Sequence, residues 1–196
     1  MKTYAGLALA LILSAEALAE GRFRPLDPAA KLAFPRDHGS HDDARLEWWY
    51  LTGHLLAEDG ARFGYQLTFF RVGLLDEPRP NDPSSFRARD LHLAHFALTN
   101  LAEGTFEHAE RLHRTGPAAS AREERLAVTN EDWRLEELGG KLVLFARTGQ
   151  GATLRELSLL LTPEKPFVLH GENGLSRKGA EPEAVSRYVS YTRLAA

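Results

Sequence analysis

The chain of 196 residues contains no cysteine, which excludes a disulfide framework, a thiol nucleophile and a lipid anchor on an exported cysteine. No apolar run approaches the roughly 20 residues that a membrane-spanning helix needs. Lysine and arginine number 24 against 27 aspartates and glutamates, so the net charge of −3 indicates no basic surface for nucleic acid. A Gly-x-Ser-x-Gly elbow and a phosphate-cradling glycine loop are also missing, so the usual hydrolase and nucleotide motifs predict nothing here.

The N-terminus has the pattern of an export signal. Lys2 supplies a positive charge, residues 5–13 are apolar, and small residues at positions 17 and 19 flank a cleavage point. We predict a signal peptide at residues 1–19 and a mature protein that begins at Glu20. The mature protein would be periplasmic or secreted, with no membrane span. The alternative is that the apolar stretch packs as an ordinary helix.

The rest of the sequence is typical of one antiparallel β domain. Prolines at positions 25, 28 and 35 predict an extended N-terminal arm at residues 20–43. Strand-forming runs, separated by turn signals, follow at residues 47–52, 62–72, 91–101, 126–138, 141–147, 154–162 and 167–170. We therefore predict an all-β fold at residues 44–175, either a lipocalin-like antiparallel β-barrel or a strongly curved sandwich.

Several segments in this region carry a family likeness. Residues 34–41 read Phe-Pro-Arg-Asp-His-Gly-Ser-His, residues 47–53 read Glu-Trp-Trp-Tyr-Leu-Thr-Gly, and residues 64–71 read Gly-Tyr-Gln-Leu-Thr-Phe-Phe-Arg. Ala-His-Phe-Ala at 94–97, Asp-Trp at 132–133 and Gly-Leu-Ser-Arg-Lys-Gly at 174–179 follow in the same order. Together these motifs resemble carotenoid 1,2-hydratase, also called hydroxyneurosporene synthase, and its secreted lipocalin-like relatives.

The resemblance implies both an activity and a domain arrangement. True hydratases of this family add water to isoprenoid double bonds, while many exported relatives have only a general hydrolase assignment. Family members usually carry two lipocalin-like domains. We therefore expect residues 176–196 to be a linker and the start of a second domain that this chain does not contain.

Acids and histidines near the first predicted strand are candidates for catalysis. Asp37 and His38 lie in an acid-histidine cluster that suits proton transfer, metal ligation or loop hydrogen bonding. The spacing matches no metal template, so we predict neither a metal nor another cofactor. Glu47 begins the strand. In a dry interior its neutral form would be favoured and could protonate an alkene, whereas the alternative is an ion pair with a nearby arginine.

The fourth catalytic candidate is a histidine in a later strand. His92 and His95 are an odd number of residues apart, so they should project from opposite faces. His95 is flanked by Ala94 and Phe96, and we expect it to be the inward residue. It would act on a ligand or be a core histidine bonded to a backbone carbonyl.

The candidate ligand-binding residues are aromatic or basic strand residues. They are Trp48, Trp49, Tyr50, Tyr65, Phe69, Arg71 and Phe96. Alternation places Trp48 and Tyr50 on one face of their strand and Trp49 on the other, so one aromatic set would line an apolar pocket or fill the core. Arg71 would orient an acid, bind a ligand head group, or lie exposed at its strand end.

These observations favour an exported lipocalin-like protein that binds an apolar, isoprenoid- or lipid-like molecule, with hydratase-like addition of water to a double bond as its reaction. One alternative is a non-catalytic periplasmic lipid carrier or envelope-assembly module. Another is an incomplete half of a two-domain protein. The predicted partners are accordingly an apolar small molecule or lipid, and a second lipocalin-like domain or an envelope protein.

Overall fold

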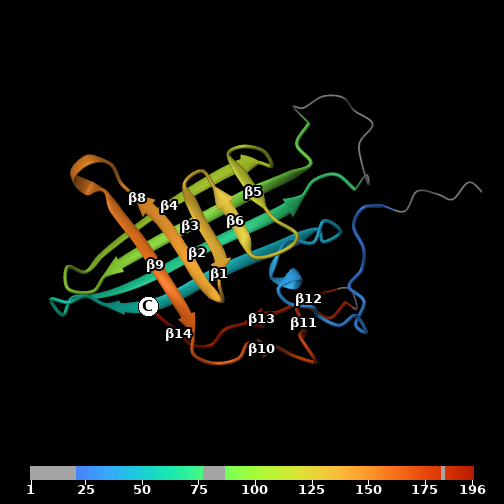
Figure 1. Ribbon diagram of the computed structural model, residues 1–196. Coiled ribbons are helices and arrows are strands. Elements are labelled where there is room, and N and C mark those ends of the chain that lie inside the picture. Colours follow the sequence, from blue (N-terminus) through green and yellow to red (C-terminus); the bar gives the residue numbers. More distant parts are fainter. Residues whose placement is uncertain (1–20, 77–86, 182–183) are drawn as a thin grey trace, which may run out of the picture.

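The computed structural model describes residues 21–76, 87–181 and 184–196, which form two main antiparallel sheets (Figure 1). The first sheet has the order β1 (Leu46–Leu56), β2 (Arg62–Gly73), β3 (Asp90–Asn100) and β4 (Thr105–Arg114). The second has the order β14 (Leu194–Ala195), β9 (Arg155–Pro163), β8 (Lys141–Thr148), β7 (Trp133–Leu138), β6 (Ala127–Asn130) and β5 (Ala119–Ala121). The predicted signal peptide lies outside the described residues.

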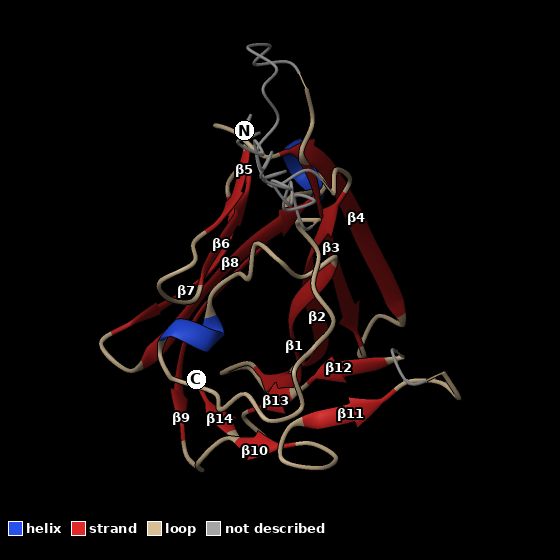
Figure 2. Cartoon of the chain, turned by 90° about the vertical axis from the view of Figure 1, so that its right-hand side faces the viewer, coloured by secondary structure: helices blue, strands red, loops and turns tan. Residues whose placement is uncertain are grey.

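Two short ribbons and two 3₁₀ turns complete the described chain. The ribbons pair β10 (Val168–Leu169) with β13 (Val189–Ser190) and β11 (Leu175–Arg177) with β12 (Val185–Arg187). The 3₁₀ turns are η1 (Arg36–His38) and η2 (Gly151–Thr153). Figure 2 shows the two main sheets facing each other, with both ribbons at one end of the sandwich. Within the described ranges, no helix is long and apolar enough to cross a membrane.

Apolar side chains fill the space between the sheets. Leu67 and Phe96 of the first sheet are 0% and 1% exposed, and Trp133 and Leu144 of the second are both 0% exposed. The rings of Phe96 and Trp133 meet edge to face, with centroids 5.8 Å apart. Trp133 also donates its indole N–H to the carbonyl of Arg147 at 3.0 Å, so its one polar atom has a partner inside the core.

The predicted all-β antiparallel fold is confirmed. Of its two predicted forms the molecule has the sandwich, because no ladder between described residues joins the first sheet to the second. The run predicted at 126–138 is two strands, β6 and β7, separated by a turn in which Glu131 has a φ of 54°. Residues 184–196 contribute β12, β13 and β14 to this same domain. Their role as a linker stays a prediction.

β4 has no counterpart among the predicted strands. Its register with β3 places His108 and Glu110 on one face and Arg111 and His113 on the other. The side chains of β4 alternate between the two faces, but polar residues occur on both of them. Sequence analysis detects only an alternation of hydrophobicity, so it does not detect this strand.

Candidate functional site

The ladders of the first sheet define an inner face, toward the second sheet, and an outer face. In one row across the inner face, Glu47 pairs with Arg71, and Arg71 pairs with His92. Trp48 and Tyr50 project from the outer face, since they alternate with Glu47 along β1. Alternation therefore separates Trp48 and Tyr50 from the predicted acid Glu47, whereas Trp49 lies on the inner face with Glu47.

An ion network with a buried centre joins the N-terminal arm to the inner face. We call it the arm network, and its members are Arg22, Asp37, His41, Asp42, Glu47, Arg71, Arg89 and Asp90. Arg71 is 4% exposed and contacts Glu47 at 2.7 Å and Asp90 at 2.9 Å. It also donates to the backbone carbonyls of His41 and Ala44. Arg22 donates to the same Asp90 at 2.6 Å, so two cations share one buried carboxylate.

His41 extends this network toward η1. Its Nδ1 lies 2.8 Å from Oε1 of Glu47, and its Nε2 lies 3.1 Å from Oδ1 of Asp37. The hydrogen bond with Glu47 is the main cause that raises the pKa of His41 above 6.5, against the opposing effect of burial. Both oxygens of Glu47 accept hydrogen bonds, Oε1 from the backbone N–H of His41 and Oε2 from Arg71. Of the two predicted roles of Glu47, the ion pair with an arginine is the one present.

His38 is the centre of a second cluster, next to the arm network. Its Nδ1 lies 3.2 Å from Oε2 of Glu137, and its Nε2 lies 3.3 Å from the hydroxyl of Tyr191. The rings of Phe34 and Phe167 lie 4.3 and 6.5 Å from the imidazole. Burial, and secondarily the charge of Glu137, raise the pKa of Tyr191. Both ring nitrogens of His38 thus have protein partners.

The outer face of the first sheet carries a band of apolar side chains. We call it the outer apolar band, and it consists of Leu46, Trp48, Phe70, Val72, Leu91, Leu93 and Leu112. The ladders arrange these residues in two adjacent rows that run across the strands. Leu46 and Leu112, at its two sides, are 51% and 58% exposed. The other five members are half-buried. A contiguous, partly exposed apolar patch marks an interaction site in many soluble proteins.

A hollow of about 220 Å³ lies on the same outer face. It is lined by Gln66, His95, Phe96, Ala97, Phe106, His108, Ala109 and Glu110. The row that contains Tyr50 and His95 lies directly beside the band, and its members His95 and Glu110 line the edge of the hollow. Tyr50 is 41% exposed and shares a short hydrogen bond with the hydroxyl of Tyr188, which raises the pKa of Tyr50 to about 12.

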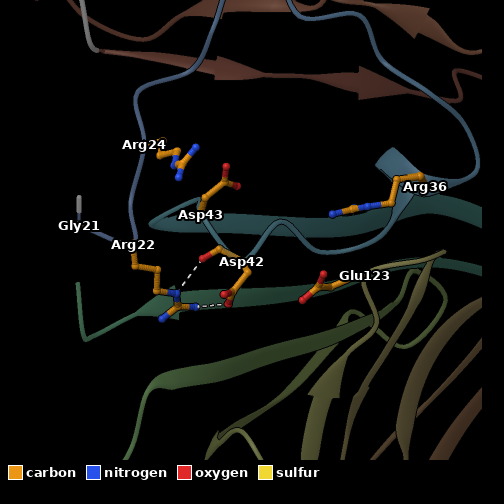
Figure 3. Close-up of a pocket in the computed structure, with 7 residues that line it drawn as sticks. All are labelled: Gly21, Arg22, Arg24, Arg36, Asp42, Asp43 and Glu123. Carbon is orange, nitrogen blue, oxygen red and sulfur yellow. Dashed lines mark hydrogen bonds and ion pairs between the residues drawn. The ribbon is translucent and has the colours of Figure 1, made fainter. Parts of the chain in front are cut away.

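Figure 3 shows a larger hollow, of about 380 Å³, beside the N-terminal arm. Its lining residues are Gly21, Arg22, Arg24, Arg36, Asp42, Asp43 and Glu123. Arginines and acids are equal in number there, and Arg22 already donates to Asp42 at 2.8 Å. This polar hollow does not suit an apolar ligand.

Comparison with known proteins assigns the family. Residues 25–196 match the AttH-like family. The chain belongs to that family. The AttH-like family is lipocalin-like and related to carotenoid hydratase. The predicted membership of a lipocalin-like family is therefore confirmed. No curated protein matches.

One solved structure is similar to this AttH-like chain over most of its length. It is a crystal structure of an AttH candidate from Nitrosomonas europaea, with 35% sequence identity and a TM-score of 0.75. The similarity covers 88% of this chain and 50% of that chain. The AttH-like chain therefore spans half the length of the solved relative.

In the AttH-like fold, four of the predicted ligand-binding residues face the interior. Tyr65, Phe69 and Phe96 are 7%, 3% and 1% exposed and belong to the core cluster, against which Trp49 packs. The indole N–H of Trp49 donates to the carbonyl of His38 at 2.9 Å. Of the two predicted roles, lining an apolar pocket or filling the core, these residues have the second, because facing side chains of the second sheet pack against them.

Two further orientations differ from expectation. His92 is the inward histidine, at 5% exposed, and its Nε2 lies 2.8 Å from the hydroxyl of Thr115. Burial is the main cause that lowers the pKa of His92 below 6.5. His95 lies on the outer face with its ring 5.5 Å from that of Phe70. Three roles were predicted for Arg71, and its contact with Glu47 at 2.7 Å fits the orientation of an acid, whereas its burial excludes an exposed strand end.

The structure adds residues that the sequence did not single out. Glu137 and Tyr191 are far from His38 in the chain, and Asp90 and Arg22 are far from Arg71. No local spacing indicates such pairs. Within residues 21–76, 87–181 and 184–196, no group of three or more histidines or acids has an arrangement suited to a metal ion.

Proposed function

We propose that this AttH-like chain is exported and binds an apolar, isoprenoid- or lipid-like molecule on the outer face of its first sheet. The observation that carries the proposal is the outer apolar band. Its two rows place seven apolar side chains, two exposed and five half-buried, on the face turned away from the second sheet. Covering such a surface with hydrocarbon removes it from water, at about 25 cal/mol for each Å².

The packing of the interior supports an outer site. In a lipocalin-like barrel the usual place for an apolar ligand is the mouth or lumen. Here Leu67, Leu144 and Trp133 occupy the equivalent space and are fully buried. Ligand binding between the sheets would require the core to separate, whereas the band needs no such change.

The resemblance also implies a specific reaction, the hydration of a double bond. The geometry supports this reaction less well than it supports ligand binding without a reaction. Protonation of an alkene needs an acid in its neutral form against the substrate. Glu47 and Asp37 are instead ion-pair partners within the arm network. We therefore propose the carrier alternative, in which the ligand leaves unchanged.

Retinol, a fluorescent isoprenoid alcohol, provides a direct test. Leu112→Ala removes apolar surface from the band, and we expect it to weaken retinol binding about tenfold. Leu160→Ala is the matched control, because Leu160 is 53% exposed on the second sheet, close to the 58% of Leu112. Circular dichroism checks that both variants are folded.

The two variants separate the outcomes. Weaker binding by Leu112→Ala alone supports the outer site. Equal affinities in both variants and the unchanged protein would place any bound retinol elsewhere, and no binding at all would refute the proposal. Mass spectrometry of extracted ligand before and after incubation tests for addition of water.

A further inference from the structure

The 220 Å³ hollow of the outer face differs from the neighbouring band in its chemistry. Gln66, His95, His108 and Glu110 contribute polar side chains to its wall. His95, His108 and Glu110 make no side-chain hydrogen bond or ion pair with any other residue in the described part of the chain. These groups are therefore available to a ligand. Gln66 donates only to Thr68, at 3.3 Å, so its amide oxygen is also available.

The hollow and the band form one continuous surface. Glu110 and His95 pair in the row next to the one that contains Leu93 and Leu112. Ala97 in the hollow lies six positions along β3 from Leu91 in the far row of the band, which corresponds to about 20 Å. The face thus has a polar end and an apolar end at a separation that suits an extended chain molecule.

The polar end is rich in hydrogen-bond acceptors. Glu110 offers a carboxylate and Gln66 an amide oxygen, and an imidazole adds one acceptor and one donor nitrogen when neutral. The carboxylate is the strongest of these acceptors and carries no hydrogen-bond donor when ionised. An acidic head group would be repelled by Glu110, and a hydrocarbon end would remove these groups from water without replacing their hydrogen bonds. A head group that donates hydrogen bonds, such as a hydroxyl or an ammonium, avoids both costs.

We infer that the hollow binds the hydrogen-bond-donating head group of a single-chain amphipathic ligand whose apolar chain lies on the outer apolar band. This inference rests on the proposed function and specifies its ligand class, an isoprenoid or fatty alcohol or amine. Glu110 accepts a hydrogen bond from the head group, and His95 lies between head and chain.

The test compares four ligands that share one chain. Farnesol, farnesylamine, farnesoic acid and the hydrocarbon farnesene are each used to displace retinol from the full chain. We expect farnesol and farnesylamine to bind about fivefold more tightly than farnesene, and farnesoic acid to bind most weakly.

Glu110→Gln should reduce the difference between farnesylamine and farnesoic acid at least threefold and leave farnesene unchanged. Glu103→Gln is the matched control, since Glu103 is an exposed acid in the turn after β3 and away from the hollow. If all four ligands bind alike, and binding still depends on Leu112, the head-group inference is overturned while the proposed function stands. If none displaces retinol, or retinol does not bind, both are overturned.

Discussion

Replacing Arg71 with methionine tests whether the arm network has the buried centre that its geometry indicates. The side chain of Arg71 is 5% exposed, and its carboxylate partners Glu47 and Asp90 are 11% and 8% exposed. Removing one partner from a buried ion pair typically costs about 3–5 kcal/mol, because the remaining charge has lost its compensation. Asp90 keeps Arg22, and Glu47 keeps His41. We therefore expect the low end, about 3 kcal/mol.

Urea denaturation at neutral pH, followed by tryptophan fluorescence, measures this loss as a shift of the midpoint at constant slope. Arg193→Met is the control. Arg193 contacts Glu164 at 2.6 Å, but their side chains are 65% and 42% exposed, so its loss should cost less than about 1 kcal/mol. If Arg71→Met costs no more than Arg193→Met, water screens the network and the argument from burial is wrong. That result would also reopen the role of Glu47 as a proton donor.

Three further predictions concern single side chains. The raised pKa of His41 means that its charged form stabilises the fold below pH 6.5 and that this contribution is lost as pH rises through the folded-state pKa. His41→Asn should therefore be less stable than the wild type in urea at about pH 6 and nearly equal to it at high pH. The lowered pKa of His92 has the opposite effect on stability. As pH falls below 6.5, His92 takes up its proton in the unfolded chain before it does so in the folded protein, so the fold loses stability. His92→Gln should flatten that acid-side loss of stability in the same titration. Leu144→Ala, at a position that is 0% exposed, should cost about 3 kcal/mol in urea denaturation, and a loss below 1 kcal/mol would show that the core collapses around the cavity.

Strands with one apolar face and one polar face could be predicted from the sequence, and strands without this difference could not. β2 alternates Phe63, Tyr65, Leu67 and Phe69 against smaller or polar residues, and its bounds are within one residue of those predicted. β4 has a mixed surface, so only its pairing with β3 identifies it. Hydrophobic periodicity detects a strand that buries one face. It does not detect a strand that is stabilised mainly by hydrogen bonds to its neighbour.

The sequence indicated which residues belong to the candidate site, but it did not indicate their hydrogen-bond and ion-pair partners. The odd spacing of the two β3 histidines correctly predicted opposite faces. Flanking Ala94 and Phe96 suggested that His95 is inward, yet apolar neighbours at i−1 and i+1 occupy the inner face themselves and so turn His95 outward. The partners of His38 and Arg71 come from distant segments, and their identity depends on how the two sheets and the arm pack.

The outer apolar band also has a competing explanation, which follows from the length of the relative. The similarity covers half of the AttH candidate, so contact with a further domain is the competing explanation for the band. A domain interface would cover the hollow and the band together and would not discriminate between head groups. A ligand site predicts the reverse: farnesol and farnesoic acid should differ, and the difference should depend on Glu110. The head-group comparison therefore distinguishes a ligand site from a domain interface, which the loss of apolar surface at Leu112 alone cannot do.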